Sequence, residues 1–246
     1  MSDNKVDLYD EFAQNWWDPG TKFHALQELN KPRFEYFDQF VRDWTGYKVL
    51  DVGCGGGFTS ELITKRGGQV SGVDPSAVLI KTAQEHARAN GLNIDYRVAV
   101  AEALPFEDKT FDAVICVDVL EHVHNLQAAI AEIYRVSKPG ALFLFDTINR
   151  TIKSKMIMIW MLENIAKEIP KGVHEWKKFI KPKELTSLLR GSNFGDLELK
   201  GLDIKGRDKA TGHFKAELND NMSVMYIGKC VKPNGDKTQW THSMPK

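Results

Sequence analysis

The sequence predicts a single α/β domain with a mostly parallel sheet and helices on both of its faces. Between residues 48 and 146, five short apolar strands alternate with helical segments, a pattern typical of such a sheet. A glycine-rich turn follows the first strand, where open α/β sheets bind ligands. Strand-like alternation returns at residues 195–230, and we expect it to complete a seven-stranded sheet as an antiparallel hairpin.

Apolar periodicity and turn residues bound the individual elements. Pro19-Gly20 separates two helices within residues 5–45, and Gly91 is a left-handed helix stop. The five strands are expected at Lys48–Val52, Gln69–Val73, Ile94–Val98, Phe111–Val117 and Ala141–Asp146. The helices between them are expected at Phe58–Arg66, Pro75–Asn90 and Leu126–Val136.

The domain is expected to span residues 1–232, with residues 151–190 as a helical insert or lid. Gly201, Gly206 and Gly212 are expected at turns between the last strands. Residues 233–246 are polar and contain proline and glycine, which predicts a disordered tail.

The composition is that of a globular protein and names no partner by itself. Thirty-three basic residues balance 33 acidic residues in a chain of 246, so no global field would attract nucleic acid. The three cysteines, Cys54, Cys116 and Cys230, lack zinc-ligand spacing and indicate reduced thiols. We find no signal-peptide pattern and no apolar run long enough to span a membrane, which predicts a cytoplasmic protein. The sequence does not indicate an oligomeric state.

The glycine-rich turn, Asp51 to Gly57, directly follows the first strand. Glycines let the backbone approach a ligand and adopt positive φ, and the next helix offers free N–H groups. Gly53, Gly55 and Gly57 fit G-x-G-x-G, whereas a dinucleotide site prefers G-x-G-x-x-G and would need a glycine at Phe58. The turn therefore disfavours a dinucleotide, and the alternative is a tight turn without a ligand.

A carboxylate and a loop extend this candidate cofactor site. Asp74 ends the second strand, 21 residues after Gly53, where it can accept hydrogen bonds from both hydroxyls of a ribose. It could also cap the helix that begins at Pro75, and both roles can hold at once. The loop Ala101–Phe106 is placed to bracket an adenine. The candidate cofactor residues are therefore Asp51, Gly53, Gly55, Asp74, Pro75, Ala101 and Glu102.

The order of these motifs resembles that of the class I S-adenosylmethionine (SAM) methyltransferases, whose domain is Rossmann-like. VLDVGCGGG, GVDPS, AEALPF, FDAVICVDVLEHV and VSKPG follow one another within residues 45–146. One departure is Val100, because many relatives carry an aspartate there that binds the adenine amine. The backbone at Ala101 or the side chain of Glu102 would have to substitute.

The flanking segments resemble the O-methyltransferases of ubiquinone biosynthesis. The strings that carry this resemblance are Phe12–Asp18, Leu29–Arg33, Thr147–Ser154 and Pro170–Pro182. The resemblance implies that Arg33 meets the cofactor carboxylate and that Val117 touches the adenosine. It also implies a catechol or phenol acceptor of the 3-demethylubiquinol type. Val173 within Gly172–His174 replaces a usual threonine, and this departure leaves a different acceptor open.

Asp118, Glu121 and His122 follow the fourth strand, beside the expected cofactor cleft. A phenolic hydroxyl needs a base, a metal or both to ionise at neutral pH. In the resembling family this cluster binds magnesium, and because Mg²⁺ prefers oxygen, Asp118 and Glu121 are the favoured ligands. His122 is then a general base or a borderline ligand, with Glu121 as the second catalytic candidate. Alternatively, Glu121 caps the next helix and His122 pairs with it.

Two features of the insert could serve the acceptor. His174 with Glu175 is a candidate second base or substrate ligand, or else a surface pair. Lys153–Leu162 combines lysines with a methionine-rich apolar run and Trp160, which suits a lid, an interfacial helix or a helix packed on the sheet. Residues 153–183 are thus the candidate for peripheral contact with the inner face of a membrane.

The main hypothesis is therefore SAM-dependent O-methylation of a small aromatic acceptor. Its nearest alternative is methylation of another small molecule at N, S or C. A nucleotide-fold oxidoreductase is disfavoured by the G-x-G-x-G spacing and the Lys138-Pro139-Gly140 turn. Asp118, Glu121 and His122 count against a non-catalytic binding scaffold.

Overall fold

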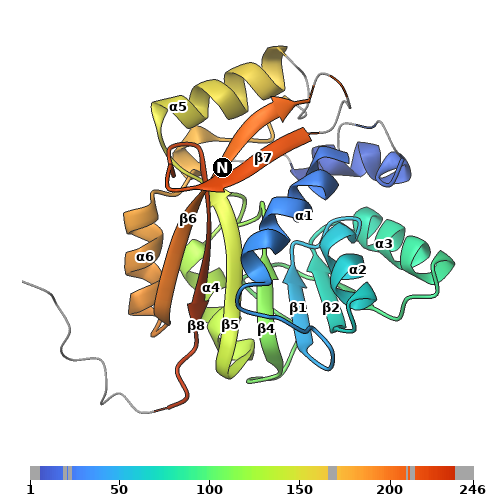
Figure 1. Cartoon of the computed structure of the whole chain (residues 1–246). Helices are drawn as coiled ribbons and strands as arrows, with labels where there is room; N and C mark the ends of the chain where they lie inside the picture. The colour runs from blue at the N-terminus through green and yellow to red at the C-terminus, as the bar shows by residue number, and fades with distance from the viewer. Residues whose placement is uncertain are drawn as a thin grey trace, which may run out of the picture.

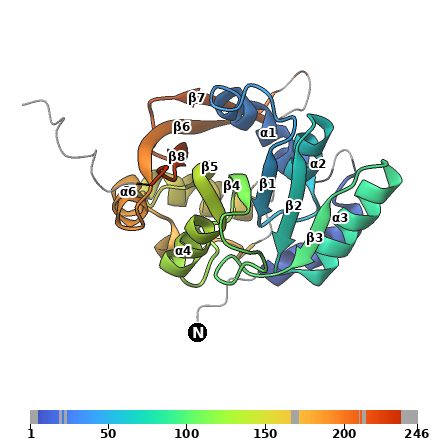
Figure 2. The same ribbon diagram turned by 90° about the horizontal axis from the view of Figure 1, so that it is seen from below.

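The computed structural model describes residues 6–18, 21, 24–165, 171–208, 210 and 214–235. These residues build one eight-stranded sheet in the order β3-β2-β1-β4-β5-β8-β6-β7 (Figures 1 and 2). The first five strands run parallel and the last three pair antiparallel, which confirms the predicted α/β class. The strands are β1 Lys48–Val52, β2 Gln69–Asp74, β3 Asp95–Val98, β4 Phe111–Cys116, β5 Ser137–Ile148, β6 Gly195–Arg207, β7 Phe214–Asn219 and β8 Met225–Val231.

The helices alternate with the parallel strands as predicted, and most of their bounds agree with the prediction to within two residues. They are η1 Val6–Asn15, α1 His24–Phe37, α2 Phe58–Lys65, α3 Ala77–Ala89, α4 Leu126–Val136, α5 Ile152–Ser154, η2 Lys155–Ile165, η3 Trp176–Lys178 and α6 Pro182–Gly191. The first N-terminal helix, η1, is a 3-10 helix. The predicted break at Pro19-Gly20 and most of the predicted tail lie outside the described residues.

The prediction of seven strands is wrong by one. β6 and β7 form the expected hairpin, but β8 then returns between β5 and β6 as an eighth strand. Gly201 and Gly206 lie inside β6 and not at turns. A Cβ on Gly201 would come 2.2 Å from the backbone oxygen of Asn221, so glycine there permits a close approach of two backbones. Gly206 has φ +81° at a register shift in the β6–β7 pairing. Gly212 lies outside the described residues.

Two apolar layers enclose the central strands. Successive residues of β4 point to opposite faces, so Val114 packs in the layer under α4 and α6, and Ile115 packs in the layer under α1 and α2 (Figure 2). Buried strands with helices on both faces are expected to be mainly apolar, and β4 is apolar except for Asp112. The carboxyl ends of β1, β2 and β4 therefore open toward the same edge of the sheet.

The insert begins as one continuous helix formed by α5 and η2 (Figure 1). Met158 and Leu162 are buried against a satellite core that includes Ile148, Leu202 and Met225. Among the described residues, no helix combines the length and apolar character needed to span a membrane. The inner face of the insert therefore packs on the sheet end, as one of the three predicted alternatives states.

Candidate active site

A cavity of about 360 Å³ lies at the carboxyl ends of β1, β2 and β4. All nine residues that were predicted to bind the cofactor line it: Arg33, Asp51, Gly53, Gly55, Asp74, Pro75, Ala101, Glu102 and Val117. Asp118 and His122 line it as well, whereas Glu121 and His174 are not part of its wall. The fold thus brings distant sequence motifs to a single cavity.

The glycine turn forms one wall of the cavity through its backbone. The N–H groups of Gly53 and Cys54 donate to the Val73 carbonyl oxygen at 2.7 and 2.9 Å, which ties the turn to β2. A Cβ on Gly53 would come 2.2 Å from Val119, and Gly53 has φ +72°, so only glycine fits without strain. A Cβ on Gly56 would come 2.3 Å from the Trp16 ring. The turn is therefore closed tightly between β2, the loop after β4 and the N-terminal segment.

Asp74 braces the turn and faces the cavity. Its Oδ2 accepts the Gly55 N–H at 2.9 Å, and its Oδ1 accepts the Ser76 N–H at 2.9 Å. The N-cap of α3 is Ser76, whose side chain accepts the Leu79 N–H, so the capping alternative for Asp74 is wrong. Burial raises the pKa of Asp74 to about 6. Each carboxylate oxygen keeps a second acceptor position, which suits two ribose hydroxyls.

The loop after β3 closes the opposite end of the cavity. Ala99, Val100 and Ala101 line it with mainly apolar surface, as an adenine ring requires. Glu102 Oε1 accepts the backbone N–H groups of His124 and Asn125 at 2.7 and 3.0 Å. Through Oε1, the Glu102 side chain therefore joins this loop to the one after β4.

Asp51 lies at the bottom of the cavity. Its Oδ2 accepts a hydrogen bond from Ser60 Oγ at 2.5 Å, and the side chain is buried. Burial raises the pKa of Asp51 to about 7. The folded protein thus favours the protonated carboxyl over a pH range in which the unfolded chain is already ionised.

We expect Asp51 to make the ligand-free protein less stable as the pH rises from about 4 to 7. The pKa of Asp51 is higher in the folded protein than in the unfolded chain. Its contribution to the free energy of unfolding is therefore fully present below the unfolded pKa and is lost as the pH rises through the folded pKa. Between pH 5 and 7 this carboxyl contributes a slope of up to about 1.4 kcal/mol per pH unit. Chemical denaturation over this pH range should show that the free energy of unfolding of Asp51→Asn falls less steeply with pH than that of the wild type, by this amount.

Asp112→Asn is the matched control for this measurement. The partial burial of Asp112 is outweighed by hydrogen bonds from Lys138 and Lys48, and its pKa lies below the usual value. It is ionised in both states above pH 5, so the slope should not change. A slope that is the same in Asp51→Asn as in the wild type would contradict the assignment.

A buried ion-pair network closes the cavity floor. Arg33, from α1, is 2% exposed, and its Nε donates to Asp146 Oδ2 at 2.6 Å while its Nη2 donates to Asp118. Asp118 has φ +56°, and its N–H donates to Asp146 Oδ1 at 2.8 Å. Arg33 therefore reaches the cavity as predicted, but two of its donors are already paired with carboxylates. Asp146, at the end of β5, was not among the predicted site residues.

Comparison with known proteins decides the family. Residues 50–145 match the family described as methyltransferase domain. The ubiquinone biosynthesis O-methyltransferase of Hahella chejuensis is 38% identical over 95% of this chain and 96% of its own length. The protein of the same name from Pasteurella multocida is 36% identical over 92% of this chain and 96% of its own. The chain belongs to the family of ubiquinone biosynthesis O-methyltransferases.

Membership of this O-methyltransferase family confirms that the protein is a SAM-dependent methyltransferase with SAM as its cofactor. A SAM-dependent methyltransferase from Thermotoga maritima, described as a possible histamine N-methyltransferase, shares the fold with a TM-score of 0.65. The match covers 92% of this chain and 99% of that one at 16% identity, so it supports the fold alone.

The three predicted magnesium ligands of this O-methyltransferase do not form a metal-binding cluster. Within the described part of the chain, no group of three or more acidic, histidine or cysteine side chains is arranged to hold a metal ion. Asp118 is neutralised by Arg33. Glu121 Oε2 accepts from Thr147 Oγ1 at 2.7 Å, and burial raises the pKa of Glu121 to about 8. The two carboxyl groups are turned to different partners, Arg33 and Thr147, and this arrangement does not fit a resident Mg²⁺ ion.

The structural alternative for Glu121, a cap on the next helix, is wrong. Asn125 caps α4 by accepting the Ala128 N–H at 3.1 Å, so Glu121 is not the cap. His122 reaches the cavity wall. Burial, with the charges of His174 and Lys178, lowers the pKa of His122 to about 3, so its imidazole is neutral at physiological pH.

His174 lies inside the molecule and pairs with a different glutamate from the one expected. Its Nδ1 lies 2.8 Å from Glu163 Oε1, and both side chains are nearly inaccessible to solvent. The ring centroid of His174 is 5.4 Å from that of His122. The structure therefore places the two predicted histidines together, and it does not support the surface pair with Glu175.

Glu163 was missed by the sequence analysis although it holds this loop. It also accepts the backbone N–H groups of Gly172 and His174 at 2.8 and 3.0 Å. It is a lone acidic residue in an apolar helical run, which is a weak signal for a buried partner. The same holds for Asp146, since a carboxylate at the end of an apolar strand reveals no partner by itself.

Proposed function

We propose that this protein transfers the methyl group of SAM to a hydroxyl of a catechol-type precursor of ubiquinone, of the 3-demethylubiquinol type. The family supports this acceptor, because the relatives that carry the name match over nearly the whole chain. The observation that carries the proposal is the single cavity in which every predicted cofactor residue meets His122.

The cavity offers complementary groups along the length of SAM. Asp74 would accept the ribose hydroxyls, and Val117 would contact the adenosine between β4 and the loop after β3. The guanidinium of Arg33, which lines the cavity, would meet the amino-acid carboxylate of SAM beside the glycine turn. Bound SAM supplies an electrophilic methyl group on a sulfonium.

The residues around the acceptor supply orientation. The neutral imidazole of His122 at the cavity wall can accept a hydrogen bond from an acceptor hydroxyl, and His174 lies beside it. Alignment of oxygen, methyl and sulfur contributes up to about 7–11 kcal/mol through proximity alone. The side chains present do not fit a resident Mg²⁺, so no step is assigned to a metal ion.

The test is methyl transfer to a demethylated quinol precursor, detected by mass spectrometry as product with one added methyl group. We expect His122→Ala to lower kcat by about 10-fold with unchanged SAM affinity, because it loses the hydrogen bond that orients the acceptor hydroxyl and not a cofactor contact. Calorimetry with SAM provides the control. Parallel loss of kcat and SAM affinity would instead indicate a structural role for His122.

Two further arms of this experiment test the remaining alternatives. A panel of amine, thiol and phenol acceptors distinguishes the quinol precursor from other small molecules. Turnover with added Mg²⁺ and with a chelator tests the metal. Turnover that strictly requires Mg²⁺ would show that Asp118, Glu121 and His122 rearrange around the ion.

We further propose that the insert contacts the inner face of the membrane from the cytoplasm. Ile152, Met156 and Trp160, spaced by four residues on one helical face, are 75%, 57% and 61% exposed. Lys153 and Lys155 flank this exposed apolar stripe. Apolar side chains with neighbouring lysines suit the headgroup boundary of an anionic bilayer.

The expected result is binding to vesicles that contain anionic phospholipid, measured by co-sedimentation. Met156→Ser/Trp160→Ser should lose at least half of the bound fraction, since it removes the exposed apolar surface. Val98→Ser, which removes an apolar side chain of similar exposure on β3, should bind as the wild type does. Equal binding of all three proteins would contradict the membrane contact.

A further inference from the structure

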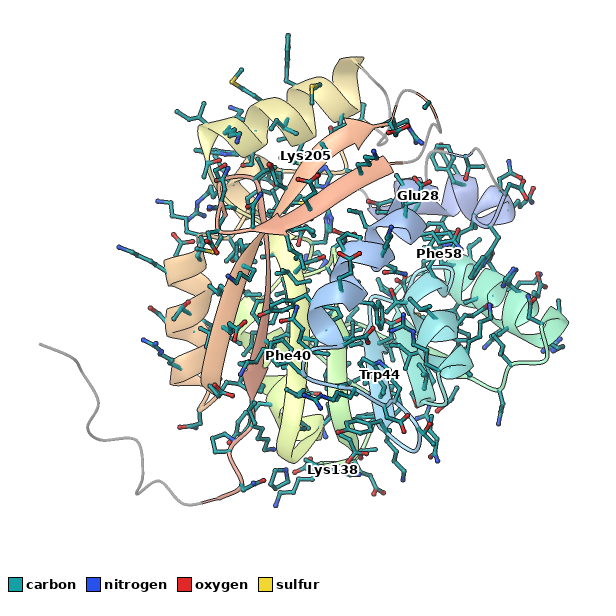
Figure 3. All side chains as sticks on the ribbon, viewed as in Figure 1. Glu28, Phe40, Trp44, Phe58, Lys138 and Lys205 are labelled. Atoms are coloured by element: carbon teal, nitrogen blue, oxygen red, sulfur yellow. The ribbon has the colours of Figure 1, made fainter. Side chains whose placement is uncertain are left out.

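Three aromatic side chains of the cavity wall pack together beside the glycine turn. Trp16 stacks on Phe58, which begins α2 (Figure 3), with ring centroids 5.6 Å apart. Tyr9 packs edge-on against Trp16 at 6.3 Å, and a Cβ on Gly56 would come 2.3 Å from the Trp16 ring. All three aromatic side chains line the cavity, and none of them was among the predicted site residues. The cavity wall is therefore aromatic beside the glycine turn.

The loop after β3, by contrast, lines the cavity with small aliphatic side chains. Its first residue, Ala99, donates its N–H to the Asp74 carbonyl oxygen at 3.1 Å, so the loop starts beside the residue that would hold the ribose. Ala99, Val100 and Ala101 all line the cavity, and none of these side chains carries a hydrogen-bonding group. Val78, in the first turn of α3, lines it as well. A purine attached to that ribose would therefore meet an aliphatic wall.

Three valines around this end of the cavity keep large exposed surfaces. Val78, Val98 and Val100 are 45%, 55% and 41% exposed. Val98 lies two residues after Tyr96 in β3, so it points to the same face of the sheet, where Tyr96 packs with Ile80 of α3. β3 and α3 lie side by side (Figure 2). The three valines thus form an apolar surface, the valine patch, that begins in the cavity wall and continues outside it.

Polar groups of this loop are engaged in holding its shape. Glu102 Oε1 accepts the N–H groups of His124 and Asn125 at 2.7 and 3.0 Å. The Val100 carbonyl oxygen accepts the Ala103 N–H at 3.1 Å. Because the valine patch is exposed, water can reach an amino group that lies beside it and can satisfy both of its N–H donors. The 6-amino group of an adenine bound here would need no partner from the protein.

We propose that the protein holds the purine of SAM by apolar contact with the valine patch and selects the cofactor by its ribose and amino acid, not by the 6-amino group of adenine. This inference rests on the proposed placement of SAM, with its ribose at Asp74. Its consequence is a cofactor specificity. The site accepts cofactors that lack the 6-amino group, and it also accepts those that carry an aromatic substituent on this group, because the substituent covers exposed aliphatic side chains.

The first test is calorimetry of the wild type with S-adenosylhomocysteine and with an analogue that carries a hydrogen in place of the 6-amino group. The two dissociation constants should agree within about threefold, since no hydrogen bond to the protein is lost. A site that hydrogen-bonds the amine would bind the analogue about 10-fold more weakly or worse. Such a loss would overturn the proposal, and the same comparison in Glu102→Gln would then show whether Glu102 binds the amine.

The second test uses S-adenosylhomocysteine with a benzyl group on the 6-amino nitrogen. It should bind about 3- to 10-fold more tightly than S-adenosylhomocysteine, because the ring covers part of the valine patch. Val98→Ser removes the part of the patch outside the cavity wall, so it should leave the affinity for S-adenosylhomocysteine unchanged and lose most of this gain. Met161→Ser, which changes a side chain 41% exposed on η2, is the matched control and should keep the gain.

The absence of a gain for the benzyl analogue, or a gain that Val98→Ser retains, would also overturn the proposal. Both tests measure binding without a methyl acceptor. They therefore decide how the purine is held even if the protein transfers no methyl group to a quinol precursor, an outcome that would count against the proposed function alone.

Discussion

Replacing Arg33 by methionine is expected to lower the free energy of unfolding by about 3–5 kcal/mol, the usual cost of breaking a buried ion pair. Arg33 is 2% exposed and pairs with Asp146, which is fully buried, and with Asp118. Methionine retains much of the apolar stem and removes the charge, so two carboxylates are left close together without their cation. Urea denaturation at pH 7.5 measures the difference.

Two further variants separate charge from packing. Arg97→Met removes an arginine of the exposed pair with Asp95, where both side chains are nearly half exposed, and should cost no more than about 1 kcal/mol. Arg33→Met/Asp146→Asn removes one of the stranded carboxylates and should recover part of the lost stability. A loss in Arg33→Met no larger than that in Arg97→Met would show that the network contributes little.

Asp74→Asn is expected to weaken SAM binding by at least about 100-fold. Two hydrogen bonds from ribose hydroxyls to a charged acceptor contribute about 1.5–3 kcal/mol each, and an amide offers only one neutral acceptor oxygen. The same substitution loosens the brace on the glycine turn, because one side-chain oxygen must then serve both Gly55 and Ser76. Calorimetry with SAM measures the loss.

The ribose contribution can be separated from the brace. Methylthioadenosine keeps the ribose and lacks the amino acid, whereas adenine lacks both, so only methylthioadenosine should share the full loss. Asp112→Asn changes a carboxyl that pairs with Lys138 and Lys48 and should bind SAM as the wild type does. Equal weakening of adenine and methylthioadenosine would indicate that Asp74 acts through the turn and not through the ribose.

The cofactor side of the site was predictable because its signals are local. The positive φ values of Gly53, Gly55 and Gly57 follow from the turn that joins a parallel strand to its helix. Asp74 ends the neighbouring strand, and parallel strands place their carboxyl ends at one edge. Chain neighbours and sheet topology together were therefore sufficient to place these residues at one cavity.

The acceptor side was predicted less well because its contacts join distant segments. Arg33 meets Asp146 across 113 positions, and His174 meets Glu163 across the end of the insert, not Glu175 beside it. The metal prediction relied on the closeness of Asp118, Glu121 and His122 in sequence. In the folded chain, Asp118 turns to Arg33 and Glu121 turns to Thr147. Side chains that are close in sequence after a strand do not have to point in the same direction.

The sequence alone determined the α/β class, the parallel direction of β1 to β5 and the glycine turn with Asp74, because strand periodicity and turn chemistry act over a few residues. Only the tertiary structure decided the eighth strand, the partners of Arg33 and His174 and the place of Tyr9 in the cavity. These features depend on which buried charged groups and aromatic rings come into contact with one another. That choice is made by desolvation and packing across the whole domain, and no local pattern encodes it.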